Sequence, residues 1–465
     1  MRRFTQISFI LTLGAGLAAA AAVAVPPASS FDHTNAGGNQ LLLRAAPAEV
    51  ERIAAQYGLT VVAGSDDALG HLSVVEGPGS MTPEMVLELL AGDPAVEGLE
   101  PVRLAALTPA AAAAASDVAA DLVKTGELAA PCSGSAAAWS GYADQEAARL
   151  IAAADGQLLS RDCGAATVAV IDTGVDPGHP VFEGALVPGY DFLLDVAGLA
   201  SEWNNLEQSV QVIVEQSVQV IVEGDGEIVV LDGTVAPIAD PDVAAELQGL
   251  PLPPYFGHGT MVAGLVRLVA PAARILPLRV FGGDGRGHLF DIVRAVYFAV
   301  DHGADVINMS FSISESSSEL QRAVRYARDH GVVCVAAAGN GGERAHVYPA
   351  TLSDAVGVAA TDLEDRLAEF SNRGSQLVEL AAPGTGVISA YPGGLFGAGW
   401  GTSFAAPLVS GSLALIEAAH PEPDAPAVHR QVNALNQGSV ALPGLNGEIG
   451  SGRLDVAATV VAAED

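Results

Sequence analysis

The stretch Thr167-Val168-Ala169-Val170-Ile171-Asp172-Thr173-Gly174 places an aspartate at the end of a short apolar run, directly before a turn. A continuous apolar run of this length is typical of a strand that is buried on both faces of a parallel sheet. Open α/β sheets carry their functional residues at the carboxyl ends of such strands. The stretch therefore predicts a buried strand that delivers Asp172 to the functional edge of a sheet.

Similar apolar runs follow downstream and alternate with helical patterns. Further strands are predicted over residues 274–280, 306–309, 332–338 and 355–360, and helices over residues 289–302 and 320–330. This alternation predicts an α/β fold with a doubly wound, mostly parallel sheet and helices on both faces. We expect this domain to span residues 139–465, with a first helix near residues 145–153 and an insertion at 191–255.

The insertion contains a repeat. The octet at residues 207–214 recurs at 215–222, and both copies alternate polar and apolar residues. The alternation favours a surface β-hairpin or a disordered flap, and a substrate-binding flap remains an alternative.

Residues 40–107 form a separate pattern. Strands at 41–43, 59–63, 72–75 and 96–104 and helices at 47–57 and 83–90 give the order β-α-β-β-α-β. This order predicts a small α+β domain of the ferredoxin-like type. Residues 108–138 are rich in Ala with Ser, Gly and Pro interruptions, which predicts an exposed linker.

The first 24 residues have the pattern of a signal peptide. Arg2 and Arg3 precede an apolar run that ends in Ala22-Val23-Ala24. We expect a secreted or extracytoplasmic protein with no stable membrane association after removal of this segment. An uncleaved N-terminal anchor remains an alternative, although the apolar run is near the lower length limit for spanning a bilayer.

The charge is strongly acidic. The chain has 54 acidic and 21 basic residues, a formal net charge of −33, and a single lysine, Lys124. Such a surface repels nucleic acid and anionic lipid, so we expect no nucleic-acid partner. The charge favours solubility and does not by itself predict substrate preference.

Export would permit disulfides, and the chain has three cysteines. Cys334 lies in an apolar run of strand type, which predicts a buried free thiol. Cys132 and Cys163 are then the candidate pair, with two unpaired thiols as the alternative.

Two further motifs join Asp172. Gly257-His258-Gly259-Thr260 opens an apolar helical pattern, and Gly401-Thr402-Ser403-Phe404-Ala405-Ala406-Pro407 opens another. A serine nucleophile with a histidine base and a carboxylate is the residue set of acyl transfer. Asp-Thr-Gly alone could be half of an aspartic-peptidase dyad, but the sequence has no second such motif.

Together the three motifs, in the order Asp, His, Ser, resemble those of the subtilisin-like serine peptidases. The resemblance spans about residues 139–460 and includes Val306-Ile307-Asn308-Met309-Ser310, Ala336-Ala337-Ala338-Gly339-Asn340 and Gly450-Ser451-Gly452-Arg453-Leu454. Residues 40–107 resemble the N-terminal inhibitory propeptide of that family.

The resemblance implies a role for each matching residue. Asp172, His258 and Ser403 would form the catalytic triad, and Asn340 would help to bind the oxyanion. The substrate would lie between two segments, Ser310-Phe311-Ser312 and Ala337-Ala338-Gly339. Polypeptides would be the substrates, and the enzyme would be made as a zymogen that processes itself and is inhibited by its own propeptide.

Departures from the family pattern limit what the resemblance implies. Ser312 stands where many relatives have glycine, so we expect broad endopeptidase activity with only a mild apolar preference. There is no room after His258 for the calcium loop of many relatives. We therefore expect no cofactor and no obligatory metal. Two alternatives stay open: a binding or scaffold protein on an inactive peptidase fold, and an inhibitor whose functional part is residues 40–107.

Overall fold

The computed structural model describes residues 39–64, 71–107, 127–128, 138–198, 200–204, 221–222, 235–239, 252–417 and 425–464. The predicted signal peptide, most of the predicted linker, Cys132 and all but the last two residues of the duplicated octet lie outside the described residues.

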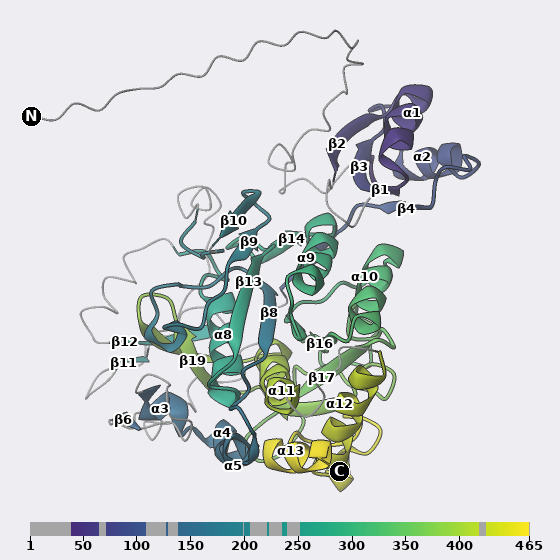
Figure 1. The fold of residues 1–465 in the computed structure, drawn as a ribbon. Helices are drawn as coiled ribbons and strands as arrows, with labels where there is room; N and C mark the ends of the chain where they lie inside the picture. Colours follow the sequence, from purple (N-terminus) through teal and green to yellow (C-terminus); the bar gives the residue numbers. More distant parts are fainter. Residues whose placement is uncertain are drawn as a thin grey trace, which may run out of the picture.

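An eight-stranded sheet forms the centre of the large domain (Figure 1). Its order is β10-β9-β13-β8-β15-β16-β17-β18, and every neighbouring pair from β9 to β18 is parallel. This arrangement confirms the predicted mostly parallel α/β sheet. The strands are β8 (Thr167–Asp172), β9 (Gly189–Asp191), β10 (Val196–Gly198), β13 (Arg274–Arg279), β15 (Val306–Met309), β16 (Val333–Ala337), β17 (Ala355–Thr361) and β18 (Leu380–Pro383).

Helices cover both faces of this sheet, because side chains alternate between the faces along each strand. Val168 and Val170 of β8 pack into the core that contains α8 and α11, while Ala169 and Ile171 pack into the core that contains α9 and α10. Among the described helices none is long and apolar enough to cross a membrane. The helices of this domain are α3 (Ser140–Ala143), α4 (Glu146–Leu150), α5 (Ala153–Leu159), α8 (His258–Val269), α9 (Leu289–Asp301), α10 (Ser318–Asp329), α11 (Thr402–Ile416), α12 (Ala425–Gly438) and α13 (Val456–Glu464).

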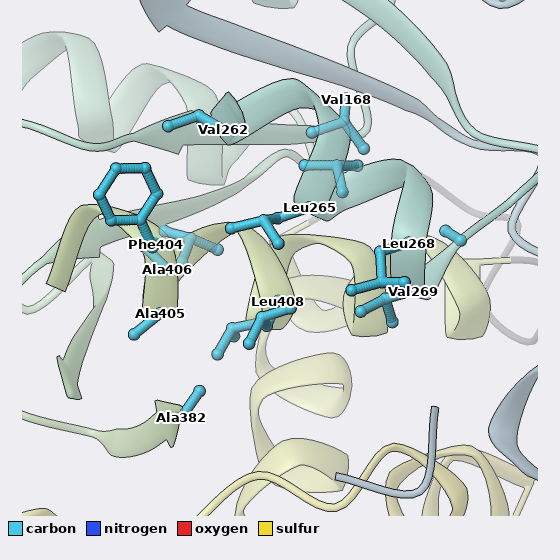
Figure 2. Close-up of a cluster of buried hydrophobic side chains, with 14 of the residues drawn as sticks. Val168, Val262, Leu265, Leu268, Val269, Ala382, Phe404, Ala405, Ala406 and Leu408 are labelled. Carbon is cyan, nitrogen blue, oxygen red and sulfur yellow. The ribbon is translucent and has the colours of Figure 1, made fainter. Parts of the chain in front are cut away.

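Helices α8 and α11 pack tightly against each other beneath the sheet. Figure 2 shows Leu265 and Val269 of α8 facing Phe404 and Leu408 of α11, and all four side chains are buried. Gly411 lies at the closest approach, since a Cβ built there would be 2.7 Å from Cβ of Val269. The absence of a side chain at Gly411 thus sets the spacing of the two helices.

Residues 39–107 fold into a smaller unit with the predicted order of strands and helices. Its antiparallel sheet has the order β2-β3-β1-β4, and α1 and α2 cover one face. In Figure 1 this unit, in purple, lies beside α9 and α10. Its elements are β1 (Gln40–Arg44), α1 (Pro47–Tyr57), β2 (Thr60–Gly64), β3 (Leu72–Glu76), α2 (Pro83–Leu90) and β4 (Gly98–Pro101).

Both faces of the small sheet are buried. Leu41 and Leu43 point into the unit's own core, and Leu42 and Val74 pack into the core of α9 and α10 in the large domain. The apolar run at 41–43 therefore has no polar member because neither face of β1 meets water.

Two predicted elements are each divided in the structure. The predicted strand 96–104 is β4 followed by a separate strand, β5 (Leu104–Ala106), which leaves the small sheet and pairs with β14 (Arg286–His288) of the large domain. The predicted helix 145–153 is α4 followed by α5. Ala152 breaks it, because its φ of 53° is incompatible with a right-handed helix.

The remaining described strands form small sheets. The predicted insertion contributes β12 (Val235–Ala239), which pairs with β20 (Leu395–Gly399) and with β11 (Ile221–Val222). β20 also pairs with β19 (Val387–Tyr391), and β6 (Glu127–Leu128) pairs with β7 (Ala138–Trp139).

The cysteines have different environments. Cys163 is disulfide-bonded. Its predicted partner, Cys132, lies outside the described residues. Cys334 in β16 is a buried free thiol, as predicted, and burial raises its pKa to about 12.

We predict that Gly411→Ala destabilises the protein by forcing α8 and α11 apart. Overpacking costs about 1–3 kcal/mol, which exceeds the gain in helix propensity of about 1 kcal/mol. Thermal unfolding of the full chain, carrying Ser403→Ala to prevent self-digestion, measures the effect. Gly444→Ala is the matched control, because a Cβ there meets nothing within 4 Å. Equal melting temperatures for the two variants would contradict the prediction.

Candidate active site

Asp172 is the last residue of β8 and is fully buried. Its Oδ1 accepts hydrogen bonds from the backbone N–H of Thr173 (2.7 Å) and from Nδ1 of His258 (2.8 Å). Its Oδ2 is buried without a hydrogen-bond partner among the described residues. The carboxyl thus fixes the His258 ring and leaves the opposite ring nitrogen, Nε2, to face other groups.

His258 is the first residue of α8 and is only 3% exposed. The chain enters this helix through Gly257, which has a φ of 90° and whose Cβ would lie 2.3 Å from the Tyr391 ring. Glycine is required there on both counts. The imidazole ring lies 5.4 Å from the ring of Phe404, the residue after Ser403.

Ser403 occupies the first turn of α11 and is 7% exposed. Its Oγ donates to the carbonyl oxygen of Ser310 (3.0 Å), and no hydrogen bond joins it to His258 in the described structure. A rotation about the Cα–Cβ bond separates this hydroxyl from other directions, and catalytic hydrogen bonds are often incomplete without substrate. The structure therefore brings Asp172 and His258 into direct contact and places Ser403 beside them.

Ser310 is fully buried and holds the backbone at the nucleophile. Its Oγ donates to the carbonyl oxygen of Ser403 (2.8 Å) and accepts from Nδ2 of Asn308 (2.9 Å). The Oδ1 of Asn308 in turn accepts from Ser410 on α11 (2.9 Å). The sequence indicated Ser310 only as a residue beside the substrate, and this link to α11 was missed because no motif encodes it.

Asn340 follows β16 and is oriented by Thr402. Its Oδ1 accepts from both the backbone N–H and Oγ1 of Thr402, each at 2.9 Å. The same hydroxyl accepts from the N–H of Gly339 (3.0 Å). These contacts turn the amide oxygen of Asn340 toward the start of α11 and fix the direction of its NH₂ group.

The other predicted substrate residues lie at the ends of β15 and β16. Phe311, Ala337 and Ala338 are buried, and Ser312 is partly exposed. Ser312 forms an antiparallel bridge with Ala106 of the small unit. The segment expected to pair with a substrate is thus paired with a strand of the same chain.

Glu202 is a site residue that sequence reasoning missed. It is 4% exposed, and burial raises its pKa to about 7, with the charge of Asp172 adding to the rise and hydrogen bonds from Thr173 and Thr260 opposing it. No periodicity or motif marks this glutamate. In the described part of the chain no group of three His, Cys, Asp or Glu residues is arranged to hold a metal ion.

Comparisons with known proteins match this geometry to one family. The profile described as the subtilase family matches residues 164–452. A thermophilic serine proteinase from Bacillus sp. (strain AK1) is 37% identical over 250 residues, which are 54% of this chain and 51% of that protein. Thermitase from Thermoactinomyces vulgaris is 33% identical over 261 residues, 54% of this chain and 74% of that protein. The chain thus spans about half the length of the first relative.

A solved structure supports the same fold. The crystal structure of fervidolysin from Fervidobacterium pennivorans, described as a keratinolytic enzyme related to subtilisin, superposes with a TM-score of 0.65 at 22% identity. The superposition covers 91% of this chain and 61% of that one.

We predict that Gly259→Ala separates His258 from Asp172. A Cβ at Gly259 would lie 2.1 Å from the carbonyl oxygen of Gly174 and 3.1 Å from Cβ of Asp172. Because backbone atoms cannot rotate away, we expect destabilisation of about 3 kcal/mol. Thermal unfolding and a crystal structure of the variant test this. Gly178→Ala, whose Cβ would have one contact at 3.4 Å, should leave the melting temperature unchanged. An intact 2.8 Å bond in the Gly259 variant would show the prediction to be wrong.

Proposed function

Because the chain belongs to the subtilase family, we propose that it is a serine endopeptidase that hydrolyses peptide bonds with Asp172, His258 and Ser403. The observation that carries the proposal is the 2.8 Å hydrogen bond between Asp172 and Nδ1 of His258, formed next to the helix start that holds Ser403.

The geometry supports a defined role for each member of the triad. Ser403 Oγ attacks the substrate carbonyl, and His258 Nε2 accepts its proton and later protonates the leaving amine. Asp172 holds the imidazole in the required tautomer and stabilises the imidazolium. Because His258 must be unprotonated to accept the proton, activity falls on the acid side.

The oxyanion is bound by Asn340 and the start of α11. The Oδ1 of Asn340 is engaged by Thr402, so the NH₂ end of the amide is the end that faces the developing negative charge. The backbone N–H of Ser403 supplies a second donor at a helix N-terminus. Loss of one such donor typically lowers turnover by about 10²–10³-fold.

The substrate is a polypeptide that adds a strand to the enzyme. The segments that contain Ser312 and Gly287 already pair with an extended strand, β5, which supports this mode of binding. Ala337 and Ala338 offer small, apolar surroundings at the end of β16, which supports a broad specificity with a mild apolar preference.

We predict that a fluorophosphonate probe labels Ser403 in the processed protein and that Ser403→Ala abolishes labelling. The probe reacts only with a serine that a neighbouring base activates. Peptide mass spectrometry locates the label. Ser412→Ala is the control, because Ser412 is buried on the same helix and should not affect labelling. An unlabelled Ser403 in folded, processed protein would favour the inactive scaffold alternative.

Residues 39–107 are proposed to act as the inhibitory propeptide of this enzyme. A buried ion pair joins the two parts: Nε of Arg44 donates to Glu319 at 2.8 Å, and the side chains are 11% and 1% exposed. Glu100 accepts from Oγ of Ser317 (2.6 Å) and from the backbone N–H of Ser318 (2.9 Å) at the start of α10. A carboxylate at a helix N-terminus is electrostatically favourable.

The path of β5 supports inhibition by occupation of the substrate groove. β5 pairs antiparallel with β14, with Ala106 opposite Arg286, and Leu107 N–H donates to the carbonyl oxygen of Gly285 (2.9 Å). The chain is thereby directed along the groove as a tethered peptide at high effective concentration. The disulfide at Cys163 supports the further proposal that the enzyme acts outside the cytoplasm.

We predict that the protein matures itself by cutting between residues 105 and 131. Wild-type protein should shorten to the large domain, and Ser403→Ala should remain full length apart from removal of the signal segment. Intact-mass measurement over time follows the reaction, with Ser412→Ala as the active control. If wild type and Ser403→Ala shorten at the same rate, another protease carries out the cut and the self-processing proposal fails.

A further inference from the structure

Glu202 lies behind the Asp172–His258 pair, and the proposed mechanism gives it no role. Its side chain accepts four hydrogen bonds. Oε1 accepts from the backbone N–H groups of Gly259 (3.0 Å) and Thr260 (3.4 Å) and from the hydroxyl of Thr173, and Oε2 accepts from the hydroxyl of Thr260.

These donors come from two elements that must be held in register. Thr173 directly follows Asp172, while Gly259 and Thr260 directly follow His258. The Thr173 hydroxyl also accepts from Gly259 N–H (2.9 Å), which closes the contact between the two segments. One carboxyl group therefore bonds to the neighbours of both members of the pair.

Backbone hydrogen bonds hold Glu202 itself in place. Its N–H donates to the carbonyl oxygen of Val175 (3.3 Å), and the N–H of Val175 donates to Ala200 (2.9 Å). The following residue, Trp203, packs its ring against Phe256. The carboxyl is thus presented by a fixed segment.

We propose that Glu202 is a positioning residue for His258, holding the first turn of α8 against the turn after Asp172 so that the 2.8 Å bond of the pair is kept. The inference rests on the proposed function in treating His258 as the base. Glu202 has no contact with substrate in this role and acts only through the orientation of the imidazole.

Protonation of Glu202 weakens this arrangement. The charged or titratable groups near it are Asp172, Tyr391 and, across a small cavity, Arg279. Its pKa is raised to about 7, so the carboxylate is complete only above that pH. Below it, one oxygen carries a proton and accepts fewer hydrogen bonds. The acid limb of the activity profile should then depend on two protons, those of His258 and Glu202.

The test compares Glu202→Gln and Glu202→Ala with Glu417→Gln and Glu417→Ala in the self-processed enzyme. Glu417 is a matched control: burial also raises its pKa to about 7, and it bonds Gln431 at the far end of α11. Both glutamines should remove a buried ionisation, so both should reduce the loss of stability that accompanies ionisation as pH rises from about 4.5 to 7.

Only the Glu202 variants should change catalysis. We expect Glu202→Ala to lower kcat by about 10²-fold with KM nearly constant, because misplacement of a catalytic group acts on the chemical step. Glu202→Gln retains a carbonyl acceptor and should recover most of kcat, with an acid limb that depends on one proton. If folded Glu202→Ala matches Glu417→Ala in kcat and in its acid limb, the proposal is overturned.

A readout independent of turnover separates this inference from the proposed function. In full-length protein carrying Ser403→Ala, the proton on Nδ1 of His258 gives a downfield NMR signal while it is bonded to Asp172. Adding Glu202→Ala should shift or remove that signal, and adding Glu417→Ala should not. An unchanged signal overturns the inference. An inactive wild type with the expected signal change would refute only the proposed function.

Discussion

The packing of α8 against α11 is the constraint on which the rest of the structure depends. His258 begins one helix and Ser403 lies in the first turn of the other, so their separation is set by how closely the helices approach. Gly411 allows that approach, and the surrounding apolar side chains fill it (Figure 2). The sheet then adds Asp172 at the end of β8, and the three side chains meet although 86 and 145 positions of sequence separate them.

Buried polar side chains refine what the apolar packing sets. Ser310 and Thr402 fix the backbone of Ser403 and the amide of Asn340, and Glu202 bonds to the segments beside Asp172 and His258. Each group is largely withdrawn from water, where an unmade hydrogen bond is costly and a made one is strongly directional. Close approach of backbones at glycines leaves room for this layer without cavities.

Much of this arrangement could be predicted from the sequence, for reasons that differ between residues. Asp172 ends an apolar run and His258 and Ser403 begin helical patterns, so local periodicity located all three and their family resemblance grouped them. The same periodicity could not locate Glu202, because its partners are brought to it only by the folded chain. It also could not divide residues 96–104, since an extended apolar run looks the same whether it pairs within one sheet or crosses to another.

The burial of the small sheet on both faces gives the release of residues 39–107 a direction. Leu42, Leu72 and Val74 are almost completely buried against the large domain. Once the chain is cut and the parts separate, this row faces water, and a unit of this size has little other core to compensate for it. The freed unit then loses folded stability and becomes open to further cleavage, so separation cannot be reversed by rebinding. Two-sided burial makes the junction a ratchet: it supports assembly while the chain is continuous and prevents reassembly after the cut.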